Sequence, residues 1–505
     1  MARNPINKSA NRSSSTRRDF LKQSAFVAGM GVWVASERPL RALQEQSANE
    51  RINVASIGIG GKGDSDSDEA AKHANLIAVC DIDDKRLDAK VHSHPKAQRF
   101  NDFRKMLDKL GKEIDAVTIS TPDHTHAVAT MMAIKMGKAV YTQKPLAHDV
   151  WEARQLRLAA AEHKVASQMG NQGTCHTRLR EGVEAIQAGA IGNVREVHVW
   201  TNRPIWPQSP LIRTRPPEAL VPPHLHWDEW LGTAPVRPYA EKFYHPFNWR
   251  GWRDFGTGAL GDMGCHTTNL PFMALKLGHP VSMVAQSEEL NPETYPGWAQ
   301  VEFEFPEREG LPSVKLTWYE GHKGGKPVDA NGQLSLEGGE LVLPPRDLIE
   351  HVMGEYNKLL TARDDKRVKD GTKVELNESG AIMVGEKGIL YSPSDDGKDW
   401  DLLPADDFRD YKPPAPTLAR NPLGYSEKTM DEGQKVEWLN AIRGGPAPLS
   451  NFNYAGLLAE FILLGNVAIR AGGQKLTWDA PNMKFPNAPD AERFLRRTYR
   501  EPWSL

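Results

Sequence analysis

The sequence predicts an α/β protein with more than one domain, of which the first is a Rossmann domain, that is, a doubly wound parallel sheet. Three observations support this prediction. The chain has 505 residues, too many for one compact domain. An apolar strand runs into a glycine-rich turn at residues 58–63. Apolar strands and helical stretches then alternate with short connections as far as about residue 170, which is typical of a parallel sheet.

The glycine-rich turn has the pattern of a dinucleotide-binding site. The strand at residues 51–57 leads into G-x-G-x-x-G. Such glycines permit a tight turn and let the backbone approach a pyrophosphate, while the helix that follows offers free N–H groups. We therefore expect this turn to bind a cofactor through Gly58, Ile59, Gly60, Gly61, Lys62 and Gly63.

Asp81 indicates which cofactor binds. It ends a second apolar run, Leu76–Cys80, at the distance from the turn where a ribose-binding acid is expected. A carboxylate accepts hydrogen bonds from ribose hydroxyls and repels a 2′-phosphate, so NAD is favoured over NADP. Lys85 and Arg86 lie close in sequence and leave NADP open.

A run of acidic residues, Asp64, Asp66, Asp68 and Glu69, crowds the start of the first helix. These carboxylates would repel a phosphate, with Lys62 offsetting part of their charge. Acidic residues also stabilise a helix N-terminus through its macrodipole. The sequence therefore predicts that they face solvent.

The remaining elements of the first domain follow from apolar runs and capping residues. Helices are expected at Phe103–Leu110, His124–Met136 and Val150–His163. Strands are expected at Ala116–Ser120, Ala139–Thr142 and Val165–Met169. Polar clusters follow these strands at residues 121–126, 143–145 and 170–172. Ligands of doubly wound sheets bind at the carboxyl ends of the strands, so the clusters predict a binding site there.

Five motifs in a fixed order, GIGGKG, CDID, STPDHTH, QKP and GDMGCH, resemble the Gfo/Idh/MocA (glucose-fructose oxidoreductase and inositol dehydrogenase) family. The resemblance extends over roughly Ile52–Leu275 and returns at residues 463–479. It implies an NAD-binding domain at 50–170 and, at 171–490, an α+β domain with an open, mostly antiparallel sheet that binds substrate and often mediates homo-oligomers. Residues 325–430 form an insertion-like segment to which no function is assigned, and residues 491–505 form a C-terminal tail.

The resemblance also implies the catalytic residues. Lys144 corresponds to the lysine of the family's E-K-P motif, and Asp262 and His266 match its D-x-x-x-H pair, in which the histidine acts as acid and base. Thr121, Pro122, His126, Gln143 and Lys144 would contact the cofactor, and Pro145 would set a turn, with a cis bond as one form. Gln143 departs from the family because it replaces the motif's glutamate.

Taken alone, Asp262 and His266 would also fit a metal site or an ordinary helix pair. Their i, i+4 spacing places both on one helix face. No H-E-x-x-H motif or cysteine cluster supplies further ligands, so no metal is predicted. Histidine, with a pKa near operating pH, suits removal of a hydroxyl proton.

The segment before this pair, residues 244–253, is rich in aromatic and basic residues, which suit the apolar faces and hydroxyl edges of a sugar. The substrate is therefore expected to contact Asn171, Trp249, Trp252 and Arg253. For Trp200 and Trp206, core packing and a site role stay equally open.

Charge and cysteine content exclude several classes. Lys and Arg number 63 against 65 Asp and Glu, so nucleic acid is not an expected partner. The three cysteines form neither a disulfide framework nor a zinc motif and are expected to be small buried residues.

Residues 1–42 resemble a twin-arginine export signal. Arg17 and Arg18 precede Phe20 and Leu21, and a short apolar run follows at 25–35. The protein is therefore expected in the periplasm, with no stable membrane span in its mature form. An uncleaved signal that anchors the chain stays open.

The expected function is that of an exported oxidoreductase that moves hydride between NAD(H) and a secondary alcohol of a sugar, glycoside or polyol. NAD would be tightly bound, because free cofactor is scarce outside the cytoplasm. Two alternatives stay open. One is an NAD-dependent glycosidase that works by transient oxidation and elimination, and the other is a non-catalytic nucleotide-binding protein.

Overall fold

The computed structural model describes residues 51–324, 339–424 and 427–505. The predicted export signal and part of the insertion-like segment lie outside the described residues. Residues 51–505 belong to one compact unit.

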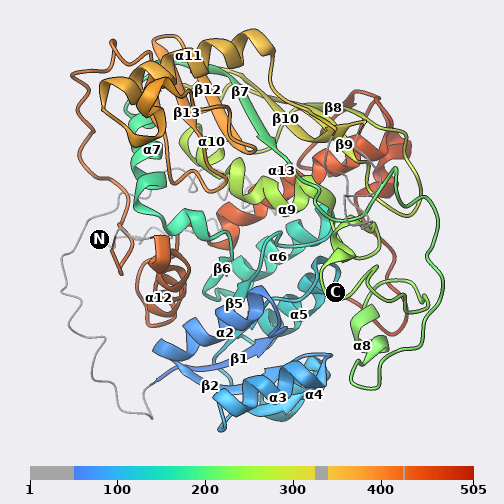
Figure 1. Ribbon diagram of the computed structural model, residues 1–505. Coiled ribbons are helices and arrows are strands. Elements are labelled where there is room, and N and C mark those ends of the chain that lie inside the picture. Colours follow the sequence, from blue (N-terminus) through green and yellow to red (C-terminus); the bar gives the residue numbers. More distant parts are fainter. Residues whose placement is uncertain (1–50, 325–338, 425–426) are drawn as a thin grey trace, which may run out of the picture. The chain divides into compact units, whose positions relative to one another are not determined.

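The first sheet has six parallel strands in the order β3-β2-β1-β4-β5-β6, as expected of a Rossmann domain (Figure 1). The strands are β1 (Asn53–Ile57), β2 (Asn75–Cys80), β3 (Gln98–Phe100), β4 (Ala116–Ile119), β5 (Ala139–Thr142) and β6 (Ser167–Met169). The helices between them are α2 (Lys62–His73), α3 (Asp84–Ser93), α4 (Phe103–Leu110), α5 (Asp123–Lys135) and α6 (Val150–His163). The prediction of a doubly wound parallel sheet is confirmed.

Aspartate side chains begin three of these helices. Asp83, Asp102 and Asp149 cap α3, α4 and α6 by accepting a hydrogen bond from a backbone N–H of the first turn. Asp149 and Glu152 form a reciprocal capping box. Because all strands are parallel, the turns that follow them meet at one edge of the sheet, where the polar clusters lie.

The second sheet has nine strands, eight of them in the order β14-β13-β12-β7-β10-β9-β8-β15, with β11 (Glu340–Leu341) paired to β10. The eight are β7 (Val194–Thr201), β8 (Ser282–Ser287), β9 (Trp298–Phe305), β10 (Val314–Lys323), β12 (Gly380–Gly385), β13 (Gly388–Ser392), β14 (Asp401–Leu403) and β15 (Leu476–Thr477). Among the described strands of this sheet, only β7 and β10 pair in parallel. The expected mostly antiparallel sheet is therefore confirmed.

The insertion-like segment extends this sheet. It supplies β11 to β14 and the helix α11 (Arg346–Ala362). Apolar residues of α11, among them Val352, Tyr356 and Leu360, pack against Tyr391 of β13 and Trp200 of β7 in a second core. Trp200 is thus a core residue, and its indole N–H donates to the Asn377 carbonyl at 2.8 Å.

Helices join the two sheets. They are α7 (Thr177–Gln187), α8 (Trp227–Leu231), α9 (Gly258–Thr267), α10 (Asn269–Ala274), α12 (Met430–Ile442) and α13 (Phe452–Arg470). The helix α13 packs against α6, α9 and β8, and Figure 1 shows it beside α9 between the sheets. Among the described helices, α13 alone is long and apolar enough to cross a membrane, but most of it is buried in the protein core.

Candidate functional site

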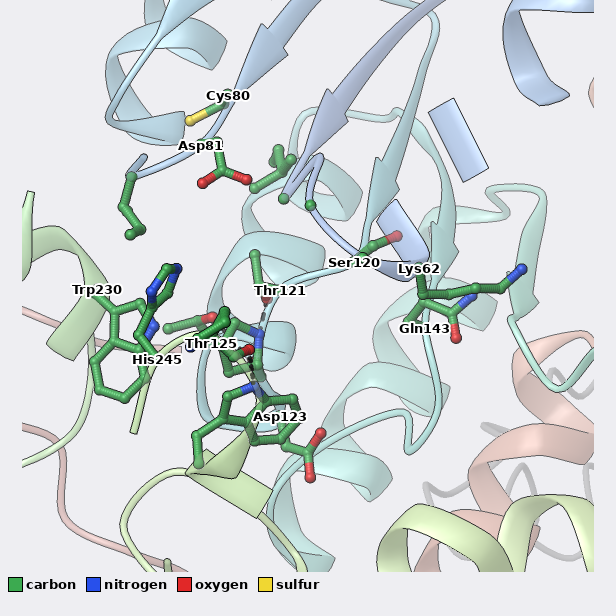
Figure 2. Close-up of a pocket in the computed structure, with 18 of the residues that line it drawn as sticks. Lys62, Cys80, Asp81, Ser120, Thr121, Asp123, Thr125, Gln143, Trp230 and His245 are labelled. Carbon is green, nitrogen blue, oxygen red and sulfur yellow. Dashed lines mark hydrogen bonds between the residues drawn. The ribbon is translucent and has the colours of Figure 1, made fainter. Parts of the chain in front are cut away.

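A cavity of about 420 Å³ opens at the carboxyl edge of the first sheet. Loops of the second domain close its other side, and Figure 2 shows Trp230 and His245 opposite the turns of the first domain. Of the predicted residues, the following line it: Gly58, Gly60, Gly61, Lys62, Asp81, Thr121, Pro122, Gln143, Lys144, Trp249 and Asp262. Ile59, Gly63, His126, Asn171, Trp252, Arg253 and His266 do not.

The glycine turn has the geometry that a pyrophosphate needs. Gly58 has φ of 75°, and a Cβ there would lie 2.6 Å from the Ser120 carbonyl oxygen. A Cβ on Gly63 would lie 2.0 Å from the Gly58 carbonyl oxygen, so this glycine permits close packing of the helix on the strand and does not face the cavity. A Cβ on Gly61 would meet nothing within 4 Å, which leaves the turn open where it faces the cavity.

Asp81 closes the turn from the end of β2. Its two carboxylate oxygens accept the backbone N–H groups of Ile59 at 2.8 Å and Asp83 at 3.0 Å. Burial raises the pKa of Asp81, although Arg86 acts in the opposite direction. The Arg86 guanidinium lies over Gly60, where a Cβ would be 1.9 Å from its Nη1. Arg86 is therefore the group that would meet a 2′-phosphate.

The acidic run does not face solvent as a whole, and that prediction was wrong for Asp66. Asp66 is fully buried and lies 2.5 Å from the Lys435 ammonium of α12. Burial alone would raise the pKa of Asp66, but the charges of Lys435 and Lys62 outweigh it and lower the pKa. Asp64 and Asp68 pair with Lys90 at 2.6 Å. Each of these three carboxylates thus has a basic partner, and none of them lines the cavity.

Asp66 also explains the departure at Gln143. The Gln143 side-chain N–H donates to Asp66 Oδ2 at 2.8 Å, and Ser120 donates to the same oxygen at 2.8 Å. A glutamate at this position would bring a second carboxylate against a buried one. An amide instead supplies the donor that Asp66 needs.

Lys144, Asp262 and Arg250 form a charged group in the cavity wall. The Lys144 ammonium donates to Asp262 Oδ1 at 2.9 Å and to the Asp262 carbonyl at 2.6 Å. Arg250 Nε donates to the same carboxylate oxygen at 3.1 Å. Burial opposes ionisation of Asp262, but Lys144 and Arg250 outweigh it, so its pKa lies well below the ordinary value. The Lys144–Pro145 bond is cis.

His266 lies one turn further along α9, beside the cavity and not in its wall. Its Nδ1 is 3.0 Å from Oδ1 of Asp396, at ion-pair distance but outside hydrogen-bond geometry. Asp396 belongs to the loop between β13 and β14, so the insertion-like segment reaches the predicted acid–base residue. Burial opposes ionisation of Asp396, but His266 lowers its pKa overall.

Asp123 is a cavity residue of the polar cluster 121–126 to which the sequence analysis assigned no role of its own. It occupies the asparagine position of the T-P-N-x-x-H pattern, at the start of α5. Its Oδ2 accepts the Thr257 hydroxyl at 2.6 Å. Burial raises the pKa of Asp123 to about 7. A carboxyl group that titrates near neutral pH can act as an acid or a base.

His126 holds the cavity loops from behind. Its ring nitrogens lie 2.7 Å from the carbonyl oxygens of Pro145 and Thr121. Burial lowers its pKa, and a neutral imidazole donates to only one of the two. It thus joins the loops after β4 and β5, and it does not line the cavity itself.

The residues predicted to bind substrate lie in different environments. Trp249 lines the cavity, and the Arg250 guanidinium lies 4.3 Å from its ring. Trp252 is fully buried in an aromatic cluster with Tyr244. Asn171 is also fully buried and donates to the Cys265 carbonyl at 3.5 Å.

Arg253 lines a second cavity. Trp206 is buried, and its indole N–H donates to the side-chain oxygen of Gln208 at 2.7 Å. Aromatic composition alone could not distinguish these environments.

The C-terminal tail contributes Trp503 to the cavity. Its ring lies 4.3 Å from the Arg104 guanidinium and 5.8 Å from the ring of Phe103, at the start of α4. Trp503 therefore lies near Asp81 and Asp102, at the end of the cavity where the ribose-binding acid is found.

The open turn at Gly61 and the buried Asp81 fit a dinucleotide, with the turn for the pyrophosphate and the carboxylate for a ribose. Among the described residues, no group of three or more His, Cys, Asp or Glu side chains is placed to hold a metal ion. The three cysteines are free and buried.

Comparison with known families gives two matches, one in each domain. Residues 52–171 match the model of the GFO_IDH_MocA oxidoreductase family, NAD-binding Rossmann fold. Residues 185–311 match the C-terminal alpha/beta domain of the oxidoreductase family. Residues 312–505, which hold β10 to β15, lie outside both matches.

Curated relatives match less than a third of the chain. The chain is 30% identical over 150 residues to inositol 2-dehydrogenase of Rubrobacter xylanophilus, which covers 28% of this chain and 42% of the relative. It is 32% identical over 139 residues to inositol 2-dehydrogenase 3 of Saccharopolyspora erythraea, covering 27% and 40%. The chain thus spans about two fifths of the length of these relatives.

Solved structures share the fold over both domains. WlbA dehydrogenase from Bordetella pertussis, in complex with NADH and UDP-GlcNAcA, has a TM-score of 0.53 and 15% identity, covering 85% of this chain and 97% of that one. Aldose-aldose oxidoreductase from Caulobacter crescentus, complexed with glycerol, has a TM-score of 0.51 and 15% identity, covering 85% and 100%.

Proposed function

We propose that the chain is an oxidoreductase of the Gfo/Idh/MocA kind and that it transfers hydride between NAD(H) and a secondary alcohol of a sugar, glycoside or polyol, because residues 52–171 and 185–311 match models of that family. One observation carries the proposal. Lys144 is held by Asp262 in the wall of the same cavity that contains the glycine turn and Asp81. The names of the relatives, which include inositol dehydrogenases and an aldose-aldose oxidoreductase, support the class of substrate.

Each charged residue has a part in binding or proton transfer. NAD, when bound, supplies the hydride acceptor. Lys144 donates a hydrogen bond to the substrate hydroxyl and stabilises the developing alkoxide. Asp262 stays ionised and, with Arg250, fixes the position of the ammonium. The hydroxyl proton passes to a base beside the cavity, for which His266 is the family's residue and Asp123 is the one in the wall.

We test this by adding sugars, glycosides and polyols to purified protein with NAD and measuring the near-ultraviolet absorbance of reduced nicotinamide. The wild type should show a rise with at least one compound. Lys144→Met should retain NAD binding but lose about 10²–10⁴-fold in kcat, because it removes the hydrogen-bond donor at the reacting oxygen. An unchanged kcat in this variant would exclude the assigned role of Lys144.

We propose further that NAD is retained between turnovers. Trp503 supports this, because the tail brings it to the end of the cavity near Asp81. Nucleotide should therefore be released only on denaturation of the purified protein, and Trp503→Ala should speed exchange of bound NAD at least about tenfold, with Trp503→Phe as the conservative control. Protein that purifies without nucleotide would contradict retention.

We also propose that the protein is exported and that it forms homo-oligomers. The sequence around Arg17 and Arg18 motivates the twin-arginine route, and replacement of both by lysine should leave the protein in the cytoplasm. Glu302 and Glu304 of β9 and Lys315 of β10 are partly or fully exposed and offer part of a sheet face for a second copy. Light scattering of the purified protein measures the oligomer directly.

Asp123 favours a second candidate, the NAD-dependent glycosidase. That reaction needs a base to remove a C–H proton beside the transiently oxidised carbon, and a carboxyl with a pKa of about 7 in the cavity wall can serve. Turnover of a glycoside in D₂O would then place deuterium at that carbon in the product. Cleavage without deuterium would exclude Asp123 from this role.

A further inference from the structure

A second cavity, of about 270 Å³, lies apart from the first and shares none of its lining residues. The start of α6, the end of α13, the C-terminal tail and loop residues between 233 and 295 meet there. Its wall contains five arginines, Arg253, Arg470, Arg493, Arg496 and Arg497. We call it the arginine cavity.

Two of these arginines are already engaged. Arg497 donates to the Thr233 hydroxyl at 2.6 Å and pairs with Glu152 at 3.1 Å. The Arg496 guanidinium lies 3.8 Å from the ring of Trp151 and is exposed at the rim.

Arg253 and Arg470 have guanidinium nitrogens that lack partners. Arg253 donates through Nε to the Thr294 carbonyl at 3.0 Å, but its buried Nη2 has no hydrogen-bond partner in the described chain. Arg470 lies 4.1 Å from the ring of Phe494, and its buried Nε likewise has no partner among the described residues. A buried cationic donor without an acceptor is costly, so the site favours an added anion.

The acidic and neutral groups of the wall do not balance these charges. Burial raises the pKa of Tyr295 to about 12, so the phenol stays neutral. Burial and the neighbouring Glu152 raise the pKa of Asp149, whose oxygens accept the backbone N–H groups of Glu152 and Arg497. Asp254 is paired with Arg237. Burial lowers the pKa of His148, which leaves its ring uncharged.

The helix α6 adds to the positive potential, because its first residue, Val150, lies in the wall. Arg493 approaches from the exposed side, with its guanidinium 4.7 Å from the ring of Phe494. Arg470 and Arg493 therefore both contact Phe494, and Arg253 lies beside Tyr295 in the same wall.

We propose that the arginine cavity binds a tetrahedral oxyanion, a phosphate or sulfate group, through Arg253, Arg470 and Arg493. Guanidinium donors match the oxygens of such a group and form charge-assisted hydrogen bonds with it. A bound anion would hold together α6, α13 and the tail that continues to Trp503.

The test is equilibrium dialysis of radiolabelled inorganic phosphate against NAD-saturated protein at constant ionic strength, so that the glycine turn is already occupied. We expect about one phosphate per chain and at least about tenfold weaker binding in Arg470→Gln and in Arg253→Gln, as for loss of one charge-assisted hydrogen bond. Arg346→Gln, on the exposed face of α11, is the matched control and should bind like the wild type. Arg493→Gln lies toward the rim, so it should fold normally and still bind more weakly.

Thermal unfolding separates the sources of the anion. Inorganic phosphate, sulfate and glycerol phosphate are compared with chloride at equal ionic strength. Stabilisation by phosphate and sulfate supports a free anion, and a much larger effect of glycerol phosphate supports an esterified group. Equal stabilisation by chloride and phosphate, or equal phosphate binding by Arg493→Gln and the wild type, would overturn the proposal.

Discussion

Replacing Gln143 by glutamate, the residue of the motif that this segment resembles, should destabilise the protein. Gln143 donates to the buried carboxylate of Asp66 at 2.8 Å. The variant Gln143→Glu removes the donor and puts a carboxyl group in its place. Either both groups ionise and repel, or one of them keeps a proton.

The smaller of these two costs determines how much stability the variant loses. At about 2.8 Å and an effective dielectric constant of about 20, two charges repel by roughly 6 kcal/mol. Holding a glutamate of ordinary pKa about 4.3 protonated at pH 7 costs about 4 kcal/mol. An acid–carboxylate hydrogen bond returns about 1–2 kcal/mol. The expected loss at pH 7 is therefore about 2–3 kcal/mol.

The loss should depend on pH with a defined sign. The introduced glutamate would have a folded-state pKa above its unfolded value, so its stability contribution is present at low pH and lost as pH rises. The deficit relative to wild type should be near zero at about pH 5 and about 3–4 kcal/mol at about pH 8. Differential scanning calorimetry should show a Tm lower by about 4 °C or more at pH 7.

Two further variants make the test specific. Gln98→Glu changes an exposed residue of β3 and should leave Tm unchanged within error. The double variant Asp66→Asn with Gln143→Glu restores one donor and one carboxylate, and should recover most of the loss. A pH-independent deficit, or a double variant no more stable than the single one, would refute the reasoning.

Three other predictions address the site. Gly63→Ala should weaken NAD binding more than about 100-fold, because its Cβ would lie 2.0 Å from a backbone oxygen. Gly60→Ala should weaken NAD binding less than about tenfold, because its Cβ would meet only the flexible end of Arg86. Equal losses of affinity in equilibrium dialysis would contradict this. Asp396→Asn should lower kcat at least about tenfold and leave NAD affinity unchanged. Asp399→Asn, at an exposed position, is the control and should leave kcat unchanged. A normal kcat in Asp396→Asn would exclude a role of Asp396 in the mechanism. If Asp123 is a base, kcat/KM should rise with pH as its carboxylate forms near pH 7, and Asp123→Asn should flatten that rise; a wild-type profile in the variant would exclude it.

The first domain could be predicted from sequence because its signals are local. The strands expected at Ala139–Thr142 and Ala116–Ser120 match β5 and β4 within one residue. The helices at Val150–His163 and Phe103–Leu110 match α6 and α4 at both ends, since aspartate caps mark where they start. The helix α3 was missed because its sequence, DKRLDAKVHS, is mostly polar and only Leu87 and Lys90 are buried.

Residues of the candidate site could be predicted where a motif specifies both the residue type and its position in the fold. Lys144 and Asp262, both predicted from motifs, lie together in the cavity wall. Composition was not sufficient to place Trp252 and Arg253. The aromatic and basic segment 244–253 contributes residues to a buried core and to two separate cavities. Asp123 had a usable signal, namely an acid where the family pattern has asparagine.

The residues that no motif could reveal enter the site from the added segment and from just beyond it. Asp396, in the β13–β14 loop, reaches His266, and Lys435, in α12, reaches Asp66. Lys435 is fully buried, so it needs a carboxylate partner, and Asp66 on α2 supplies one. With Asp66 occupying that position, the residue before Lys144 must donate a hydrogen bond and not carry a second negative charge. The glutamine of the Q-K-P motif, the acidic run of α2 and the lysine of α12 are therefore parts of one change in the charge balance behind Lys144.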